Sequence, residues 1–351
     1  MHESMVLDTA TRIFADLADP QTVNRTKDDR WKTQLWQALR DAGLTLAWVS
    51  EAHGGAGGSL EDGFEILAAA GRFAAAVPLA ETMLAGWLLS RAGIAPSSGM
   101  MTVLPGRPGD RISCSAIGTL SGRARHVPFA RDARHFAVCA HDKEAVLIAL
   151  MEAELCSLTA GHNLAGEPSD TVTFDRVKPL YVARSPNGFD QRSLMTMGAV
   201  ARSMQAAGAL ESILTLCVQY ANERVAFERP IGKFQAIQHG LARLAGEVAA
   251  AIAAARSAAQ ALARDEDSDA LFLEAASAKV RCAEASEKAT AIAHQIHGAI
   301  GFTKEHVLHR FTLRLLSWRD DFGDECHWAA ELGTRIAARG AVALWPLIAS
   351  R

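Results

Sequence analysis

The sequence has few aromatic residues, no cysteine pairs and no long apolar run, and each absence excludes a class of protein. Aromatic residues make up only 6% of the 351 residues, whereas 49% are hydrophobic, which favours close packing of alanine-rich helices over a large β-sandwich. The six cysteines include no C-x-x-C pair, which argues against a disulfide framework or a zinc site and for a reducing compartment. The longest clean apolar run, Ala341–Ala349, is too short to span a bilayer.

Excess positive charge is also lacking. The 36 lysines and arginines are outnumbered by 39 acidic residues, for a formal net charge of −3. This balance gives no reason to expect binding to nucleic acid or to an anionic membrane. The first residues lack a charged start followed by an apolar core, so no signal peptide is predicted. We expect a soluble, cytoplasmic, globular protein.

The hydrophobic periodicity changes twice along the chain, which predicts an α+β fold that is mostly α. Apolar residues recur at three- and four-residue steps up to about residue 96, and again from about residue 184. Between these zones lie short apolar runs bounded by proline, glycine and aspartate, among them Ile112–Ser115 and Phe136–Ala140. We predict an N-terminal helical domain (1–96), a small antiparallel middle β-domain (97–183) and a C-terminal helical bundle (184–351).

Several motifs favour ordinary structural interpretations. The glycine-rich loop 54–58 lacks both a Lys-Ser/Thr pair and the G-x-G-x-x-G spacing, so Ser59 is better interpreted as a helix N-cap. The histidine pairs at 294/297 and 306/309 have metal-ligand spacing, but no acidic or cysteine set completes a site, and we predict no metal. No G-x-S-x-G element supports a serine hydrolase.

The most informative stretch is 220–239, YANERVAFERPIGKFQAIQH. A helix carrying Arg224 is interrupted by a Pro-Ile-Gly turn, and a new helix is expected to begin near Phe234-Gln235. Arg224 is a permanent planar cation suited to a pyrophosphate, and Gln235 offers a donor and an acceptor to an adenine or ribose. An ordinary helix–turn–helix with a surface arginine fits the same residues.

This stretch resembles the R-x-x-F-G-x-x-I-G-x-F-Q-x-[IV]-Q-H segment of the acyl-CoA dehydrogenase family, with Glu228 in place of the usual glycine. Downstream, QIHGAIGF (295–302) is similar to the family's Q-[IV]-x-G-G-x-G-[FY], with Ala299 in place of one glycine. Near the start, WVSEAHGGAGGS resembles V-P-E-x-x-G-G-x-G. The likeness covers nearly the whole chain.

The resemblance implies an FAD-dependent enzyme that removes two hydrogens from the α and β carbons of an acyl-CoA thioester. A carboxylate takes the α proton, flavin accepts hydride from the β carbon, and the electrons usually pass to an electron-transfer flavoprotein. Two segments from different subunits would contact FAD across a subunit boundary, so an oligomer is expected. Residue by residue, the cofactor-binding positions are Arg224, Phe227, Phe234, Gln235, Gln295, Ile296, Gly298 and Ala299.

The departures from the family pattern concern the catalytic base and the flavin pocket. The two positions at which family members carry the catalytic glutamate correspond here to Phe322 and Gly198. The T-E-P-x-x-G-S-D flavin loop has no counterpart in 113–122, and the W-I-T-N segment against the flavin reads 126–129, HVPF. Neither base position can accept a proton.

A sequence of this family with no carboxylate at either base position resembles the smaller subunits of heterotetrameric acyl-CoA dehydrogenases of steroid side-chain degradation. In those enzymes a second acyl-CoA dehydrogenase subunit supplies the base. We therefore favour such a subunit, with homo-oligomeric assembly as the other possibility. A self-sufficient dehydrogenase would need a displaced base, for which Asp321 and Glu325 are the only near candidates. A non-catalytic structural or regulatory subunit that has lost flavin is a third hypothesis, and a flavin monooxygenase on the same fold is a fourth.

Overall fold

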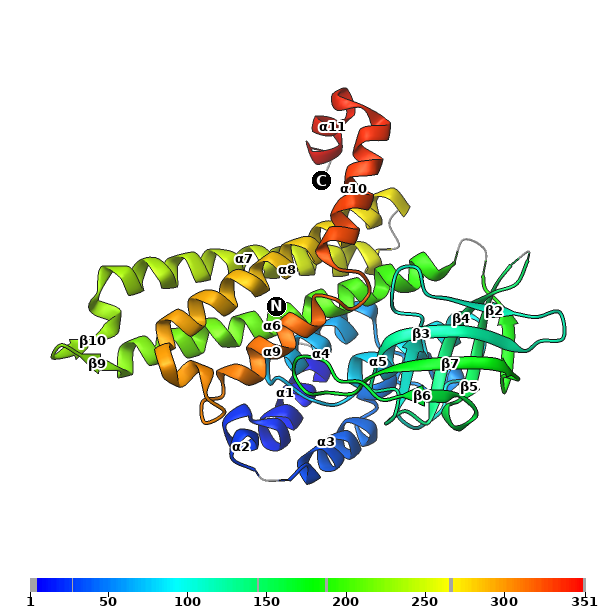
Figure 1. Ribbon diagram of the computed structural model, residues 1–351, viewed down its shortest axis with the longest axis horizontal. Helices are drawn as coiled ribbons and strands as arrows, with labels where there is room; N and C mark the ends of the chain where they lie inside the picture. Colours follow the sequence, from blue (N-terminus) through cyan, green and yellow to red (C-terminus); the bar gives the residue numbers. More distant parts are fainter. Residues whose placement is uncertain (1–4, 27, 144, 187–188, 265–267, 350–351) are drawn as a thin grey trace.

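The computed structural model describes residues 5–26, 28–143, 145–186, 189–264 and 268–349. It confirms the predicted α+β class: helices, then a sheet, then a bundle of long helices (Figure 1). The charged and polar run 264–269, RDEDSD, predicts a solvated turn, and it lies largely outside the described residues. Among the described residues, no helix combines the length and apolar character needed to cross a membrane.

The N-terminal part consists of helices joined by short turns. Ser59 caps the fourth helix, because its hydroxyl accepts a hydrogen bond from the backbone N–H of Asp62 at 3.0 Å, as the sequence predicts. The elements are α1 (Met5–Ala18), α2 (Pro20–Arg25), α3 (Arg30–Asp41), η1 (Leu44–Leu46), η2 (Glu51–His53), α4 (Leu60–Arg72) and α5 (Leu79–Arg91).

The middle part is a single sheet with the order β6-β7-β3-β2-β4-β5-β8, and β1 pairs with β4 outside this path. Most pairings are antiparallel, as predicted, but β1 and β2 both run parallel to β4. The strands are β1 (Met101–Leu104), β2 (Arg111–Cys114), β3 (Leu120–Pro128), β4 (His135–His141), β5 (Val146–Glu152), β6 (Ser157–Thr159), β7 (Ser169–Val177) and β8 (Tyr181–Arg184), with η3 (Ala153–Leu155) before β6.

The C-terminal part is a bundle in which α6, α7 and α8 pack against one another (Figure 1). The long helices are α6 (Gln191–Glu223), α7 (Gln235–Ala263) and α8 (Ser268–His297), followed by η5 (Gly298–Phe302), α9 (Leu308–Trp318), α10 (Glu325–Arg339), η6 (Ala341–Ala343) and α11 (Leu344–Ala349). Between α6 and α7 lie a two-stranded hairpin, β9 (Val225–Ala226) and β10 (Arg229–Pro230), and the turn η4 (Ile231–Lys233).

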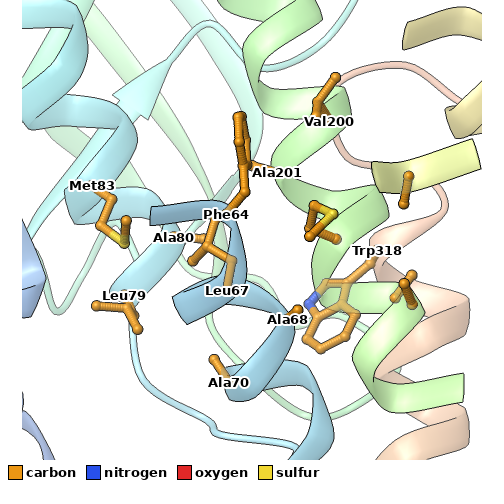
Figure 2. Packing of buried hydrophobic residues seen from close by; sticks show 14 of the residues in the cluster. Phe64, Leu67, Ala68, Ala70, Leu79, Ala80, Met83, Val200, Ala201 and Trp318 are labelled. Atoms are coloured by element: carbon orange, nitrogen blue, oxygen red, sulfur yellow. The ribbon is translucent and has the colours of Figure 1, made fainter. Parts of the chain in front are cut away.

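Helix α6 of the bundle packs closely against α4 of the N-terminal part, and a glycine on each helix allows this close approach. A β-carbon at Gly208 would lie 1.9 Å from the carbonyl oxygen of Ala68 in α4, and one at Gly71 would lie 2.0 Å from that of Gln205. The two backbones therefore approach too closely for any larger residue. Figure 2 shows the resulting core, where Leu67 and Ala68 of α4, Met83 of α5 and Trp318 of α9 pack near Val200 and Ala201 of α6.

Candidate functional site

The two segments that resemble the family's cofactor motifs lie at one end of the bundle (Figure 1). The hairpin β9–β10 follows the C-terminus of α6, and η5 follows the C-terminus of α8. Tyr220 of α6 stacks on His297 of α8, with ring centroids 4.5 Å apart, and this contact holds the two helix ends together. Residue 239 at the end of the first motif and residue 295 at the start of the second are 56 positions apart in sequence. The packing of the bundle helices brings the two motifs to the same end.

The hairpin is a tight turn that presents an aromatic ring to solvent. Phe227 and Glu228 both have positive φ angles, +52° and +66°, as the central residues of a two-residue hairpin turn require. This backbone explains why a glycine suits the position that Glu228 holds here. The Phe227 side chain is 88% exposed, and its ring lies 6.1 Å from that of Phe234. A large exposed apolar side chain on a fixed turn is suited to contact a ligand or another chain.

Arg224 and Gln235 flank this hairpin with their side chains exposed. The backbone of Arg224 is fixed: its N–H donates to the carbonyl of Tyr220 at 2.9 Å, and its carbonyl accepts from Ile231 at 2.8 Å. Its guanidinium forms no ion pair within the part of the chain that the structure describes. Gln235 is the first residue of α7, and Phe234 is its N-cap. Arg229 places its guanidinium carbon 4.3 Å above the Phe234 ring.

The second motif presents a similar mixture of fixed and exposed groups. Gln295 and Ala299 are exposed, while Ile296 is buried beneath them. Gly298 has a φ of +62° and ends α8 in the left-handed region. A ligand could therefore reach Gln295, Gly298 and Ala299, whereas Ile296 supports the segment from inside.

The two positions that the family resemblance assigns to the catalytic glutamate are in direct contact, and the side chain of one fills the space beside the other. A β-carbon built on Gly198 of α6 would lie 2.3 Å from Cγ and Cδ1 of Phe322. Phe322 is 2% exposed, its N–H donates to the carbonyl of Gly106 at 3.1 Å, and its carbonyl accepts from the Trp328 indole at 2.9 Å. The ring is therefore fixed against α6.

Asp321, one of the two displaced-base candidates, is held in an ion pair. Its carboxylate accepts from Nε of the buried Arg202 at 2.9 Å, and Arg202 also donates to Glu81 at 2.5 Å and to Gln205 at 2.6 Å. Burial raises the pKa of Glu81, although the Arg202 guanidinium opposes this effect. Asp321 is thus one of the three side chains that accept hydrogen bonds from the buried Arg202 guanidinium.

The loop that carries Asp321 is held a second time by Lys279 of α8. Its ammonium donates to the carbonyls of Trp318 at 2.8 Å and Asp321 at 2.7 Å. Burial lowers the pKa of Lys279 to about 8. The other candidate, Glu325, forms an ion pair with Arg319. Both candidate carboxylates therefore have cationic partners.

Side chains fill most of the cavity beside Phe322. It has a volume of about 10 Å³, and its lining includes His126 and Pro128 of the segment that the resemblance places against flavin, together with Asp321 and Phe322. The other lining residues are Glu81, Thr102, Val103 and Gly106. Such a volume holds at most about one water molecule, so neither a flavin ring nor a thioester fits there.

The histidine pairs lie at the α8–α9 end and pack against aromatic rings. His294 stacks on Phe302 with centroids 4.4 Å apart, and His297 lies 4.6 Å from His306. Burial lowers the pKa of His294, His297, His306 and His309. No group of three or more potential metal ligands occurs among the described residues.

The residues that sequence reasoning missed are Arg202, Glu81 and Lys279. Arg202 is the only charged residue in the otherwise apolar and small-residue run 193–210. A lone charge within a buried helix requires a partner, so this run contained a usable signal. Which acids serve as partners depends on contacts 119 to 121 residues away in sequence.

Comparison with known proteins identifies the family. The acyl-CoA dehydrogenase N-terminal domain matches residues 1–95, and the acyl-CoA dehydrogenase C-terminal domain matches residues 188–319. The chain is 28% identical over 316 residues to acyl-CoA dehydrogenase IpdE2 of Mycobacterium tuberculosis, covering 88% of this chain and 89% of that protein.

Two solved structures share the fold. The Tcur3481-Tcur3483 steroid ACAD G363A variant has a TM-score of 0.83 at 26% identity and covers 95% of this chain and 97% of that one. The ChsE4-ChsE5 complex from Mycobacterium tuberculosis has a TM-score of 0.83 at 22% identity and covers 95% and 96%. The chain belongs to the acyl-CoA dehydrogenase family of FAD-dependent oxidoreductases.

Proposed function

We propose that this chain is the base-less subunit of a two-subunit acyl-CoA dehydrogenase, and that its partner supplies the catalytic carboxylate and the pocket for the flavin ring. The observation that carries the proposal is the Phe322 ring packed onto Gly198. Both family positions for the base are uncharged, and the space between them is filled. Asp321 and Glu325 are paired with Arg202 and Arg319 instead of being free to remove a proton.

This chain's contribution to FAD binding would come from the other end of the bundle. The exposed guanidinium of Arg224 suits the pyrophosphate, Phe227 and Phe234 offer apolar contacts, and Gln235 suits the adenosine. Gln295, Gly298 and Ala299 are exposed at the same end, and the Gln295 amide adds a second polar group there. FAD, when bound, supplies the hydride acceptor for the β carbon of the acyl-CoA. We expect electron-transfer flavoprotein to be the next acceptor.

The names of the similar proteins support the assembly and the substrate class. One similar structure is described as a complex of ChsE4 with ChsE5, and the other as a steroid ACAD with two component names. We infer a heteromeric assembly and a ring-bearing or branched acyl-CoA substrate. The exposed Arg224 beside an ordered hairpin suits the cofactor pyrophosphate, so we favour a role in cofactor binding over that of a scaffold that has lost flavin.

The experiment that tests this proposal is flavin stoichiometry by visible absorbance. The chain purified alone should be colourless, and co-expression with an acyl-CoA dehydrogenase subunit encoded beside it should give a yellow complex with one FAD per pair of chains. A yellow homo-oligomer with one FAD per chain would overturn the proposal. A colourless complex would favour the scaffold hypothesis.

A further inference from the structure

A cavity of about 690 Å³ lies where the N-terminal helices, the sheet and α9 meet. Its volume is within the range of about 300–1,000 Å³ that is usual for sites of small organic ligands. Gly198, Phe322, Arg224 and Gln295 do not line it, and of segment 126–129 only Phe129 does, so it is a different cavity from the one beside Phe322. The cavity therefore needs its own explanation.

Two of the cationic side chains in this lining are already neutralised. The guanidinium of Arg314 donates to the carboxylate of Glu167 at 2.7 Å, and both side chains are buried. The ammonium of Lys32 lies 2.9 Å from the carboxylate of Asp29. Neither pair leaves an excess charge for a ligand.

Arg310 also lines the cavity, and its positive charge is not neutralised by an ion pair among the described residues. It lies one helical turn before Arg314 on the same face of α9. Its Nε is buried without a hydrogen-bond partner, and within the described ranges its guanidinium has no ion pair. Burial lowers the pKa of Arg310 to about 10, which still leaves it positively charged at neutral pH. A buried donor without a partner is costly, and a ligand anion would satisfy it.

One side of the cavity next to Arg310 is apolar and includes a flat aromatic ring. Its guanidinium carbon lies 5.8 Å from the centroid of the Trp31 ring in α3. Val77, Pro78 and Met100 add further apolar lining. An indole beside a guanidinium is suited to a planar organic group that carries an acid.

Asp132 limits the charge of such a ligand. Its carboxylate also lines the cavity, and no ion pair neutralises it in the part of the chain that the structure describes. A ligand with two negative charges would be repelled by Asp132, whereas a single acidic group can bind to Arg310. The lining therefore favours one acidic group on an apolar body.

We propose that this cavity is a binding site for an amphipathic organic monoanion, whose carboxylate, sulfonate or phosphate ester pairs with Arg310 and whose planar apolar part packs on Trp31. The site does not depend on the role proposed above for FAD. It is a second ligand site on the same chain.

The test uses two fluorescent probes of similar shape and different charge. These are the anion 8-anilinonaphthalene-1-sulfonate and the neutral N-phenyl-1-naphthylamine, each titrated into the full-length chain. We expect one anilinonaphthalene sulfonate per chain, and binding about tenfold or more weaker in Arg310→Gln, because a charge-assisted hydrogen bond is lost. The neutral probe should be unaffected by Arg310→Gln, and Trp31→Ala should weaken both probes.

Matched variants separate this result from general damage. The Asp132→Asn variant loses a negative charge that repels the anionic probe. It should bind this probe at least as tightly as the parent. Arg12→Gln, at an exposed position of α1, should change nothing. If Arg310→Gln fails to fold, Ala165→Trp fills the cavity without altering a charge and should abolish binding of both probes.

Three results would overturn the proposal. The first is anion binding that is unchanged in both Arg310→Gln and Ala165→Trp. The second is the absence of a one-to-one site in the parent chain. The third is release of the anion when the partner subunit binds, because the cavity would then belong to the interface between subunits.

Discussion

The ring of Phe322 lies against the α-carbon of Gly198, so that a β-carbon at position 198 would fall 2.3 Å from Cγ of the ring. The two positions that the family resemblance assigns to the catalytic glutamate are therefore neighbours in space, and the Phe322 ring fills the space beside Gly198. This contact excludes a glutamate at position 198 while Phe322 is in place, because its side chain would collide with the ring.

This contact predicts a strong coupling between the two positions. Gly198→Ala should destabilise the parent by about 1–3 kcal/mol, because the new methyl group overpacks a closed site. In a Phe322→Ala background the same change should cost less than about 0.5 kcal/mol, since the ring atoms that it meets are gone. Denaturant unfolding of the four proteins measures this difference. Equal costs in both backgrounds would show that the ring does not occupy this space in solution.

Arg224→Ala should weaken FAD retention in the two-subunit complex. The loss of a charge-assisted contact corresponds to about 1.5–3 kcal/mol, or roughly tenfold or more in affinity. Flavin release during dilution or gel filtration provides the measurement, with Arg12→Ala on α1 as the control. Unchanged retention in Arg224→Ala would remove this residue from the cofactor site.

Asp321→Asn separates a structural role from a catalytic one. The exchange removes one of the two carboxylates that pair with Arg202, so the free energy of unfolding should fall by up to about 3 kcal/mol. Turnover per folded complex should stay within about threefold of the parent, because a residue that only positions the loop moves no proton. A fall of about a hundredfold or more in turnover, without loss of stability, would identify Asp321 as the base.

Lys279 should make stability depend on pH above neutrality. Burial lowers its folded-state pKa to about 8 from the ordinary 10.5, so between these values the unfolded chain binds more protons than the folded one. The contribution of Lys279 to the free energy of unfolding therefore rises with pH in this window, by at most about 1.4 kcal/mol per pH unit. Chemical unfolding of the parent and of Lys279→Met from pH 7.5 to 10 tests this sign. Parallel profiles would show that the ammonium retains its ordinary pKa.

The sequence predicted much of the fold because its periodicities are local. Among the apolar residues that recur at three- and four-residue steps, Leu244 and Val248 lie buried in α7. Ser59 is the N-cap of α4, as the sequence predicts. The apolar pattern does not predict strand β3, because Arg123, Arg125 and His126 interrupt its alternation. The parallel pairing of β1 with β4 could not be predicted from the local sequence either, because it depends on the path of the chain between the two strands.

The candidate site was predictable only in part. Motif spacing alone marked Phe322 and Gly198 as the positions of the missing base. The contact between them was not predictable, because it joins α6 to the α9–α10 loop across 124 residues. Asp321 remained an open candidate for the same reason, because its partner Arg202 lies 119 residues away in sequence. The partner of Glu325, Arg319, is only six residues away, but their pairing depends on the turn between α9 and α10.

The measurement that tests the account most directly is acyl-CoA turnover with an artificial electron acceptor, by this chain alone and together with a partner acyl-CoA dehydrogenase subunit. The account predicts no turnover by the chain alone, activity of the complex, and loss of that activity when the partner's carboxylate is replaced by its amide. Turnover by the chain alone that disappears in Asp321→Asn or Glu325→Gln would contradict it.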